Sequence, residues 1–400
     1  MITPSDIPGG TRRVFLAAGE VSGDLHGAEL ARELLALDPT IRLEGIGGHR
    51  MAAVGVAVIE DSSAWGVIGW CEAARHVRPF LRRLDVTTAR LLADPPDLVV
   101  LIDFPGFNLA LLKRLGGRIR AVYYVPPMVS IRRGNRAARV AGLGARLLAI
   151  FPFEAEAFRR VGADVTFVGH PAVDHLRSVG PADRVRHRLG IPAGAPVVGL
   201  LPGSRRQELA NLLGPMLAAA GRMRATDPDV TLLLALASPI FREAIDAAVA
   251  SAGLPVTIVD GAREVMAAST VLLMASGTAT VEAMVLGVPM VVTYRSSWLT
   301  WGFAHLALTV RWAAIPNILA NDTVVPELLQ GRATAEAMTA HVQALLYDPP
   351  ARAKMRQRLL TLAEALGPPG AARRAAGEVL AAMGVSTLGI ATLKAETGIK

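Results

Sequence analysis

The sequence predicts an α/β protein with two domains, each built on a parallel sheet. Short, continuously apolar runs alternate with segments of helical spacing along most of the chain, as in sheets covered by helices on both faces. At 400 residues the chain is too long for one hydrophobic core, and its 52% hydrophobic residues can supply two. Turns of glycine and small residues follow several apolar runs, which is typical of the ligand-binding edge of such sheets.

The first half contains six predicted strands. The turn Gly19–Asp24 (GEVSGD) follows the first of them, and its two glycines allow tight backbone geometry. Ser22 or Asp24 is expected to cap the helix that follows, which ends near Asp38. A capped turn without function is an equally good interpretation. The strands are expected at Arg12–Ala18, Ile41–Ile46, Asp97–Asp103, Ile119–Val125, Leu147–Phe151 and Asp164–Val168.

The strand Asp97–Asp103 ends in a carboxylate and is followed by the sequence FPGFN. A carboxylate at the end of a buried parallel strand is poorly solvated unless it has a partner or chemical work. Asp103 is therefore the best candidate for a catalytic base. Capping of a helix that starts near Asn108 is the alternative.

Two aromatic segments also contain arginines. Trp65–Leu84 has the composition of an interfacial helix, with an ordinary amphipathic surface helix as the simpler interpretation. Pro79 argues against one uninterrupted helix there. The second segment, Trp298–Arg311, is too short to span a membrane.

The second half repeats the alternation of strands and helices. The stretch Leu200–Glu208 (LLPGSRRQE) passes from a strand through Pro-Gly-Ser into a helix, so that backbone N–H groups near Ser204 lie where an anion would bind. Arg205 adds a planar cationic fork suited to phosphate oxygens. A tight turn with a solvated arginine is the alternative. Strands are expected at Pro196–Leu201, Val230–Leu236, Pro255–Val259, Thr270–Met274 and Pro289–Tyr294.

A second turn of the anion-binding type follows the strand Thr270–Met274. Ser276, Gly277 and Thr278 combine small size with donor groups, which permits close approach of a phosphate. Glu282 lies one helical turn further on and could accept hydrogen bonds from ribose hydroxyls. Two such turns in one half of the chain favour a nucleotide site.

Composition and charge restrict the function classes. The net charge is +8, which favours anionic partners, but no zinc spacing, RNA-binding aromatic motif or basic tail indicates nucleic acid. The single cysteine, Cys71, excludes an internal disulfide. No secretory signal and no apolar segment of about 20 residues is found, so no spanning helix is expected. Asp227-Pro228-Asp229, the one D-x-D sequence, is interpreted as a turn rather than a metal site.

Eight motifs in order resemble those of the lipid-A-disaccharide synthases, a family of inverting glycosyltransferases with the two-domain GT-B architecture. The resemblance covers about Val14 to Leu346. The motifs are Ala18–Ala28, Leu43–Gly48, Leu101–Asn108, Phe151–Glu154, Val168–Pro171, Leu200–Glu208, Ala275–Ala283 and Ile315–Ala320.

The resemblance implies transfer of diacylglucosamine from UDP to diacylglucosamine 1-phosphate, giving a β-1,6-linked disaccharide and UDP without a metal or other cofactor. It implies Asp103 as catalytic base, with Arg205 and Asn317 also in the catalytic set. By the same resemblance, the UDP-sugar is bound by Ser204, Arg205, Ser276, Gly277, Thr278 and Glu282, while Glu20, Ser22, Gly23 and Asp24 line the cleft in the first domain.

Gly169-His170-Pro171 closes the first half, and the linker is expected just after it, around Val173–Pro181. The expected domains are residues 1–172, on the acceptor side, and 173–350, on the donor side, with a helical tail at 351–400 crossing back to the first domain. The expected location is the cytoplasmic face of the inner membrane, with peripheral attachment to anionic lipid. The alternative interpretation is that the two aromatic segments form core or dimer-interface helices. A homodimer would be compatible with that alternative.

One stretch departs from the family. Val125–Arg132 has no tryptophan, where the family usually has serine-proline and a tryptophan-rich run. The acceptor is therefore left open: a related UDP-sugar-dependent transferase acting on another acylated or glycolipid acceptor is one alternative, and a non-catalytic nucleotide-sugar binder is another. UDP-N-acetylglucosamine epimerases share the two-domain plan, but the carboxylates and histidines expected of them are not found in the sequence.

Overall fold

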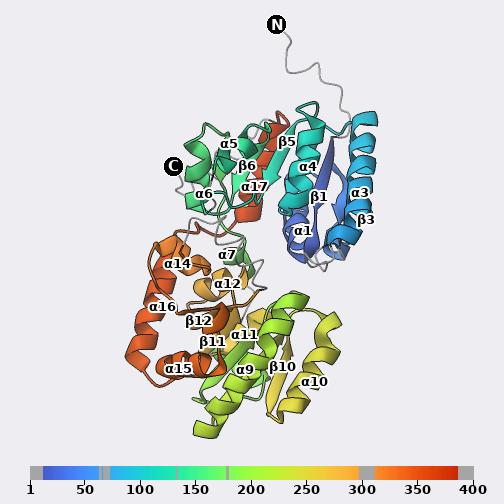
Figure 1. Cartoon of the computed structure of the whole chain (residues 1–400). Helices are drawn as coiled ribbons and strands as arrows, with labels where there is room; N and C mark the ends of the chain where they lie inside the picture. The colour runs from blue at the N-terminus through green and yellow to red at the C-terminus, as the bar shows by residue number, and fades with distance from the viewer. Residues whose placement is uncertain are drawn as a thin grey trace. The chain divides into compact units, whose positions relative to one another are not determined.

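The computed structural model describes residues 12–62, 65, 73–131, 134–176, 180–296 and 311–385. Contacts divide the chain into two compact units (Figure 1). The first comprises Met1–Ser130, Gly134–Pro171 and Pro368–Lys400, and the second comprises Ile131–Arg133 and Ala172–Gly367. Each unit contains one sheet in which the paired strands run parallel, with helices packed on it, so the predicted α/β class is confirmed.

The first sheet has seven strands, and its order reverses direction between β1 and β4. These two strands pair in parallel, with Ala18 opposite Ile102 at their carboxyl ends. Ligands of open α/β sheets bind outside such a reversal point. The turns after β1 and β4 are neighbours there, at the place expected of a ligand site. The order is β3 (Ala57–Asp61), β2 (Arg42–Gly47), β1 (Arg13–Ala18), β4 (Leu98–Ile102), β5 (Ala121–Tyr124), β6 (Arg146–Ala149), β7 (Val165–Phe167).

The second sheet has six strands and reverses in the same way between β8 and β11. Leu201 lies opposite Met274 near the carboxyl ends of this pair. The two turns predicted to bind a nucleotide therefore follow neighbouring strands. The order is β10 (Val256–Asp260), β9 (Thr231–Leu236), β8 (Val197–Leu201), β11 (Val271–Ala275), β12 (Met290–Tyr294), β13 (Glu327–Leu329).

The helices that bear on function follow these strands or flank the second sheet. In the first unit they are α1 (Glu20–Leu37), α4 (Pro105–Leu115), α6 (Pro152–Arg159) and α17 (Ala371–Ala382). In the second they are α9 (Arg206–Thr226), α11 (Ala262–Ala268), α12 (Ala279–Val285), α14 (Ile315–Ala320), α15 (Ala335–Leu346) and α16 (Pro349–Glu364).

The C-terminal helix α17 packs against α1 in the first unit (Figure 1). Arg373 pairs with Glu33 of α1 at 3.4 Å, and Glu378 pairs with Arg146 of β6. Arg374 donates through Nε to the carbonyl oxygen of Val168 at 2.9 Å. Residues from the end of the chain thus complete the first unit.

Helix α3 (Ala73–Ala93) continues through Pro79, so the predicted interruption is wrong. A proline inside a helix costs about 3 kcal/mol because it removes a hydrogen bond and crowds the preceding turn. Burial on the apolar side of α3 offsets this cost: Leu84 and Leu91 are buried, and Phe80 packs edge-on to Phe107 at 5.8 Å between ring centroids.

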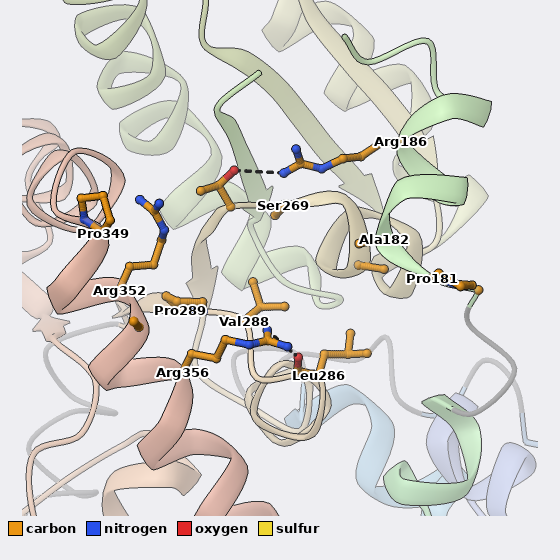
Figure 2. Close-up of a pocket in the computed structure, with 14 residues that line it drawn as sticks. Pro181, Ala182, Arg186, Ser269, Leu286, Val288, Pro289, Pro349, Arg352 and Arg356 are labelled. Atoms are coloured by element: carbon orange, nitrogen blue, oxygen red, sulfur yellow. Dashed lines mark hydrogen bonds between the residues drawn. The ribbon is translucent and has the colours of Figure 1, made fainter. Parts of the chain in front are cut away.

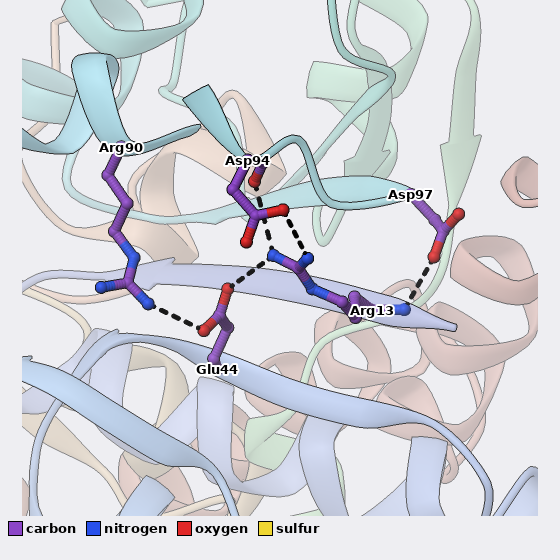
Figure 3. A network of polar contacts seen from close by, with 5 residues as sticks. All are labelled: Arg13, Glu44, Arg90, Asp94 and Asp97. Atoms are coloured by element: carbon purple, nitrogen blue, oxygen red, sulfur yellow. Dashed lines mark hydrogen bonds and ion pairs between the residues drawn. The ribbon is translucent and has the colours of Figure 1, made fainter. Parts of the chain in front are cut away.

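An ion network closes the amino-terminal edge of the first sheet (Figure 3). Arg13 of β1 donates to Asp94 at 2.7 Å and to Glu44 at 3.5 Å, and Arg90 of α3 pairs with Glu44 at 3.1 Å. The backbone N–H of Arg13 donates to Asp97 at 2.7 Å. The hydrogen bond from Arg13 holds the pKa of Asp94 below its ordinary value. This edge is stabilised by charge pairs, which leaves the opposite edge for ligands.

Two short strands were not predicted. β3 alternates exposed and half-buried residues, and β13 contains only three residues. Both are edge strands of their sheets. No helix in the described ranges is long and apolar enough to cross a membrane.

Candidate active site

Backbone strain gathers at the carboxyl edge of the first sheet. Glu20 after β1, Asp103 and Phe104 after β4, and Val125 after β5 have φ values of 61°, 51°, 45° and 58°. Such left-handed conformations cost a non-glycine residue about 1–2 kcal/mol, and a β-branched valine is a genuine outlier there. Because β1, β4 and β5 are neighbours, the strained residues lie at one edge, as is common at functional sites.

The backbone of Asp103 is held from several sides. Its N–H donates to the carbonyl oxygen of Tyr124 at 3.0 Å, and its own carbonyl accepts from the Tyr123 hydroxyl at 2.9 Å and from the Asn108 amide at 2.8 Å. The buried Asn108 amide also reaches the Ala17 carbonyl at 3.1 Å, which ties the end of β1 to the same point. These bonds offset the strain at Asp103 and fix the backbone from which its carboxylate projects.

The Asp103 carboxylate is half-buried and accepts a hydrogen bond from the Ser22 hydroxyl through Oδ2 at 3.2 Å. Oδ1 has no donor among the residues that the structure describes and is available to a ligand. Helix α4 begins at Pro105 with Phe104 as its N-cap and no side-chain capping bond, so the capping alternative for Asp103 is not realised.

Tyr123 remains a neutral donor beside this carboxylate. Burial raises the pKa of Tyr123 well above its ordinary value, and the charge of Asp103 raises it further against the opposing effect of Arg136. The phenol therefore keeps its proton, and its hydrogen bond to Asp103, over the whole neutral range.

The predicted capping roles of Ser22 and Asp24 are wrong, because α1 begins earlier, with Gly19 as its N-cap and no side-chain capping bond. Ser22 instead contacts Asp103. The buried carboxylate of Asp24 accepts backbone N–H groups of Gly48 at 2.8 Å and Met51 at 3.1 Å, which fixes the turn after β2.

Tight packing explains Gly19 of the first turn. A Cβ at Gly19 would lie 2.3 Å from the Phe104 ring, so only glycine allows this ring to close over the turn. Gly23 lies inside α1 against Ala18, where an added Cβ would be 3.5 Å away. Of the four predicted cleft residues, Ser22 contacts Asp103, and Asp24 has a structural position. Glu20 and Gly23 lie in the same first turns of α1.

The segment after β5 is held by Glu154 of α6. Its buried carboxylate accepts from the Val129 N–H at 2.8 Å and the Ser130 N–H at 3.2 Å, and also from the Ser130 hydroxyl. Burial raises the pKa of Glu154, although these hydrogen bonds oppose the shift. This is the segment that lacks the family's tryptophans, and Glu154 gives it a defined shape without them.

In the second sheet, the turn after β8 binds a carboxylate of this chain, that of Glu208 in the helix that follows. The Glu208 side chain accepts from the backbone N–H groups of Ser204 at 3.0 Å and Arg205 at 3.3 Å. Gly203 has φ 112°, and a Cβ there would lie 2.4 Å from the Glu208 carboxylate. The N–H groups predicted for an anion are therefore occupied by Glu208.

Arg205 itself remains exposed at the start of α9. Its side chain is 66% exposed and lies 3.7 Å from Glu208, a surface pair that contributes little to stability. The exposed guanidinium of Arg205 is accessible to a phosphate. Binding of an anion at this turn therefore depends on the Arg205 side chain rather than on backbone N–H donors.

The turn after β11 presents Gly277 and Thr278 to solvent. The Ser276 hydroxyl donates to the Ala313 carbonyl at 2.7 Å, so its hydrogen is used inside the protein. Glu327 of β13 accepts the N–H of Ala313 and that of Ala314, each at 2.9 Å. Ser276 and Glu327 thus hold the segment that leads into α14.

Asn317 of α14 is fully buried, and its amide makes four hydrogen bonds. The oxygen accepts from Val324 and Val325 N–H at 2.7 and 2.9 Å, and the nitrogen donates to the Val325 carbonyl at 2.9 Å and to Glu327 at 2.8 Å. Contact with a substrate would require Asn317 to give up one of these bonds. The geometry favours a positioning role over the predicted catalytic one.

Glu282 of α12 has a fixed partner that the sequence did not indicate. Arg263 of α11 donates to Glu282 Oε1 through Nε at 3.0 Å, and its Nη2 forms an ion pair with the same oxygen at 3.0 Å. Nη2 also lies 2.9 Å from Nδ1 of His175. Because arginine can only donate, Nδ1 accepts and the ring carries its proton on Nε2. One oxygen of Glu282 is thereby held, and the other has no donor among the residues that the structure describes.

Sequence reasoning missed Arg263, His175 and Glu327 as parts of the donor-side framework. They act on predicted residues from other elements, and no local spacing brings them together. Most of the segment Trp298–Arg311 lies outside the described residues, as do residues 66–72 of the first aromatic segment.

Solved structures share the fold of the whole chain. The UDP-GlcNAc 2-epimerase from Neisseria meningitidis aligns with a TM-score of 0.64 and 13% identity over 92% of this chain and 100% of that one. MurG from Acinetobacter baumannii aligns with a TM-score of 0.55 and 14% identity over 92% of this chain and 99% of that one. Together with the two sheets, this similarity confirms the GT-B fold.

Sequence relatives are closer. The lipid-A-disaccharide synthases of Geobacter sulfurreducens and Myxococcus xanthus are 39% and 38% identical to this chain, over 94% and 92% of its length and 98% and 97% of theirs. The model of a family described as lipid-A-disaccharide synthetase matches residues 14–375. Since this match includes both sheets and every predicted site residue, the chain belongs to the lipid-A-disaccharide synthase family.

Proposed function

We propose that this protein transfers a diacylglucosamine unit from UDP to diacylglucosamine 1-phosphate with inversion, releasing UDP. The observation that carries the proposal is the Asp103 carboxylate, held in a strained backbone conformation with one oxygen on Ser22 and the other available. A nucleotide-sugar binder without catalytic activity would have no use for such a strained carboxylate.

In this reaction Asp103 removes the proton of the acceptor hydroxyl as that oxygen attacks the anomeric carbon. Ser22 orients the carboxylate, and the clamped backbone prevents it from turning away. The proton passes to Asp103 as the new C–O bond forms and the bond to UDP breaks. Inversion requires only this one displacement, so a single base suffices.

On the donor side, Arg205 supplies positive charge to the diphosphate as it leaves. Ser204, Gly277 and Thr278 offer exposed small groups next to it, and Glu282 accepts from the ribose hydroxyls. The epimerase of the same fold from Neisseria meningitidis was solved with UDP-GlcNAc bound, which supports a nucleotide-sugar donor here. No step of this scheme requires a metal ion.

The test is incubation of the purified protein with UDP-2,3-diacylglucosamine and 2,3-diacylglucosamine 1-phosphate, followed by mass spectrometry. Formation of the tetra-acyl disaccharide 1-phosphate with release of UDP is expected. Release of UDP only when another acylated sugar is offered would instead support the related transferase, since Val125–Arg132 departs from the family pattern. UDP binding with neither product would support the binder.

We further propose peripheral attachment to an anionic membrane through α3. Arg78 and Arg82 are exposed on this helix, and so are the apolar side chains of Leu81 and Val86. Arg83 is engaged elsewhere, with Glu60 at 2.9 Å and with its guanidinium carbon 5.0 Å from the centre of the Trp65 ring. The exposed arginines can therefore pair with headgroups while Arg83 stabilises the fold.

Flotation with phosphatidylglycerol vesicles should recover the wild type at low salt, and replacement of both Arg78 and Arg82 by Ser should reduce recovery severalfold, because each contributes about 1 kcal/mol near an anionic surface. Replacement of both Arg159 and Arg160, exposed at the end of α6, by Ser is the matched control. Equal recovery of the two double variants would contradict attachment through α3.

Arg263 is expected to act through Glu282. The substitution Arg263→Gln should weaken UDP binding about tenfold, because it removes charge-assisted hydrogen bonds from a carboxylate whose side chain is only 16% exposed. Arg263→Lys should restore part of the affinity. The acceptor KM should not change, whereas a general loss of folding would alter every parameter.

Calorimetric titration with UDP measures this effect. Arg242→Gln is the control, because Arg242 pairs with Asp246 at 3.9 Å on the exposed side of α10 (Arg242–Ala252). UDP affinity unchanged in a folded Arg263→Gln protein would remove Glu282 from the donor site.

A further inference from the structure

A cavity of about 600 Å³ lies at the amino-terminal edge of the second sheet (Figure 2). Thr270 and Pro289, which line it, directly precede β11 and β12. Ser276 follows β11 at the other edge, so roughly 20 Å of strand separates this cavity from the donor residues. Its size is that of a small-molecule site.

Three arginines line the cavity, and no carboxylate does. Arg186 comes from α8 (Ala182–Arg188), and Arg352 and Arg356 come from successive turns of α16. None of the three has an ion-pair partner in the described part of the chain. Other arginines of this unit do have one, as in the pairs Arg222–Glu336, Arg263–Glu282 and Arg358–Asp322.

The guanidinium groups are held rigidly by backbone carbonyls. Nη1 of Arg352 donates to the carbonyl of Leu346 at the end of α15 at 2.7 Å, and Nη1 of Arg356 donates to that of Gly287 after α12 at 3.0 Å. Arg186 donates to the Thr270 hydroxyl at 3.0 Å. These bonds explain why the side chains are ordered, but they leave Nε and Nη2 of Arg352 and Arg356 without an acceptor among the described residues.

We infer that this cavity binds a phosphate-bearing anion. The unused Nε and Nη2 of one guanidinium form the fork that engages two phosphate oxygens, and two such forks come from neighbouring turns of one helix. Leu286, Val288 and Pro289 form an apolar side of the cavity, which strengthens the attraction and accommodates an organic group. The anion relieves the repulsion between like charges four residues apart on α16.

Nearby acids do not cancel this charge within the cavity. Asp348, at the N-cap of α16, is outside the lining and accepts the Ala351 N–H at 2.9 Å. Asp183, in the first turn of α8, is exposed and also outside the lining. The site does not depend on the proposed transferase activity, because it shares no residue with the donor or acceptor sets.

Calorimetric titration of the full chain with pyrophosphate tests the site. Every protein in the series carries Arg205→Ala, so that the guanidinium proposed to bind UDP does not contribute. In this background, Ala353→Glu places a carboxylate among the arginines from an exposed position of α16 that lines the cavity. It removes no hydrogen bond and should weaken pyrophosphate binding about tenfold or more.

Lys354→Gln is the matched control, because it changes the net charge by the same amount from the next residue of α16, outside the lining. It should leave binding unchanged, and circular dichroism should show both variants folded. Absence of binding in the parent, or equal affinity in the two variants, would overturn the inference. Vesicles of phosphatidylglycerol then separate the sources: loss of vesicle binding in Ala353→Glu assigns the phosphate to a lipid, and unchanged vesicle binding assigns it to a free anion.

Discussion

Asp103→Asn is expected to lower turnover by about 10²–10⁴-fold, the range for removal of a general base. Asparagine has nearly the same shape, and its amide oxygen can accept the Ser22 hydroxyl as the carboxylate does. The backbone bonds from Asn108 and Tyr123 do not involve the side chain of residue 103 and are retained. The loss therefore reports on the missing base rather than on a rearranged site.

Asp97→Asn is the matched control, at the opposite end of the same strand. The Asp97 carboxylate accepts the Arg13 N–H at the amino-terminal edge of the sheet, so this variant should lose some stability but keep its turnover (Figure 3). Turnover is measured under saturating substrates and UDP affinity by titration, and affinity should barely change in Asp103→Asn. Near-normal turnover in Asp103→Asn would remove this residue from the mechanism.

Ser22→Ala tests how Asp103 is oriented. It leaves the carboxylate in place but removes its one hydrogen bond from the described residues, at 3.2 Å. The expected effect is smaller than that of Asp103→Asn, because the backbone clamp remains. An effect on UDP affinity instead of turnover would show that Ser22 serves another purpose.

The sequence predicted every strand of both sheets except β3 and β13, one edge strand of each sheet. Most of the predicted strands are buried parallel strands, which give continuous apolar runs. β3 contains the apolar run Ala57–Ile59 but alternates exposed and half-buried residues, and β13 is only three residues long. The predicted interruption at Pro79 was also wrong. Local propensity disfavours a helix there, but burial along α3 outweighs it.

The site residues were recognised by type and by their place after a strand, but their partners were not. Glu208 occupies the backbone donors of the turn after β8. This was not predicted, because its position is also that of an ordinary glutamate in the first turn of a helix. Asp24 was predicted to cap α1, but its carboxylate fixes the turn after β2. The Asp24 contact joins segments 24 residues apart that only the completed sheet brings together, so spacing along the chain carries no signal for it. The Glu208 contacts are local, three and four residues along the chain.

Arg205→Ala is expected to lower turnover by about 10²–10³-fold, as for loss of one preorganised donor to a developing anion, and also to weaken UDP binding. Because Glu208 already occupies the backbone N–H groups of this turn, the guanidinium is the donor left for the diphosphate there. Its 3.7 Å pair with Glu208 is exposed, so the variant should fold normally.

Two comparisons sharpen the result for Arg205. Arg205→Lys keeps the charge but loses the fork, and should recover only part of the turnover. Arg206→Ala removes the neighbouring exposed arginine at the start of α9 and should have little effect. Addition of EDTA should leave the wild-type rate unchanged, because arginine supplies the charge that a metal ion would otherwise provide. A strict requirement for a divalent ion, or equal losses in Arg205→Ala and Arg206→Ala, would contradict the assignment of the leaving diphosphate to Arg205.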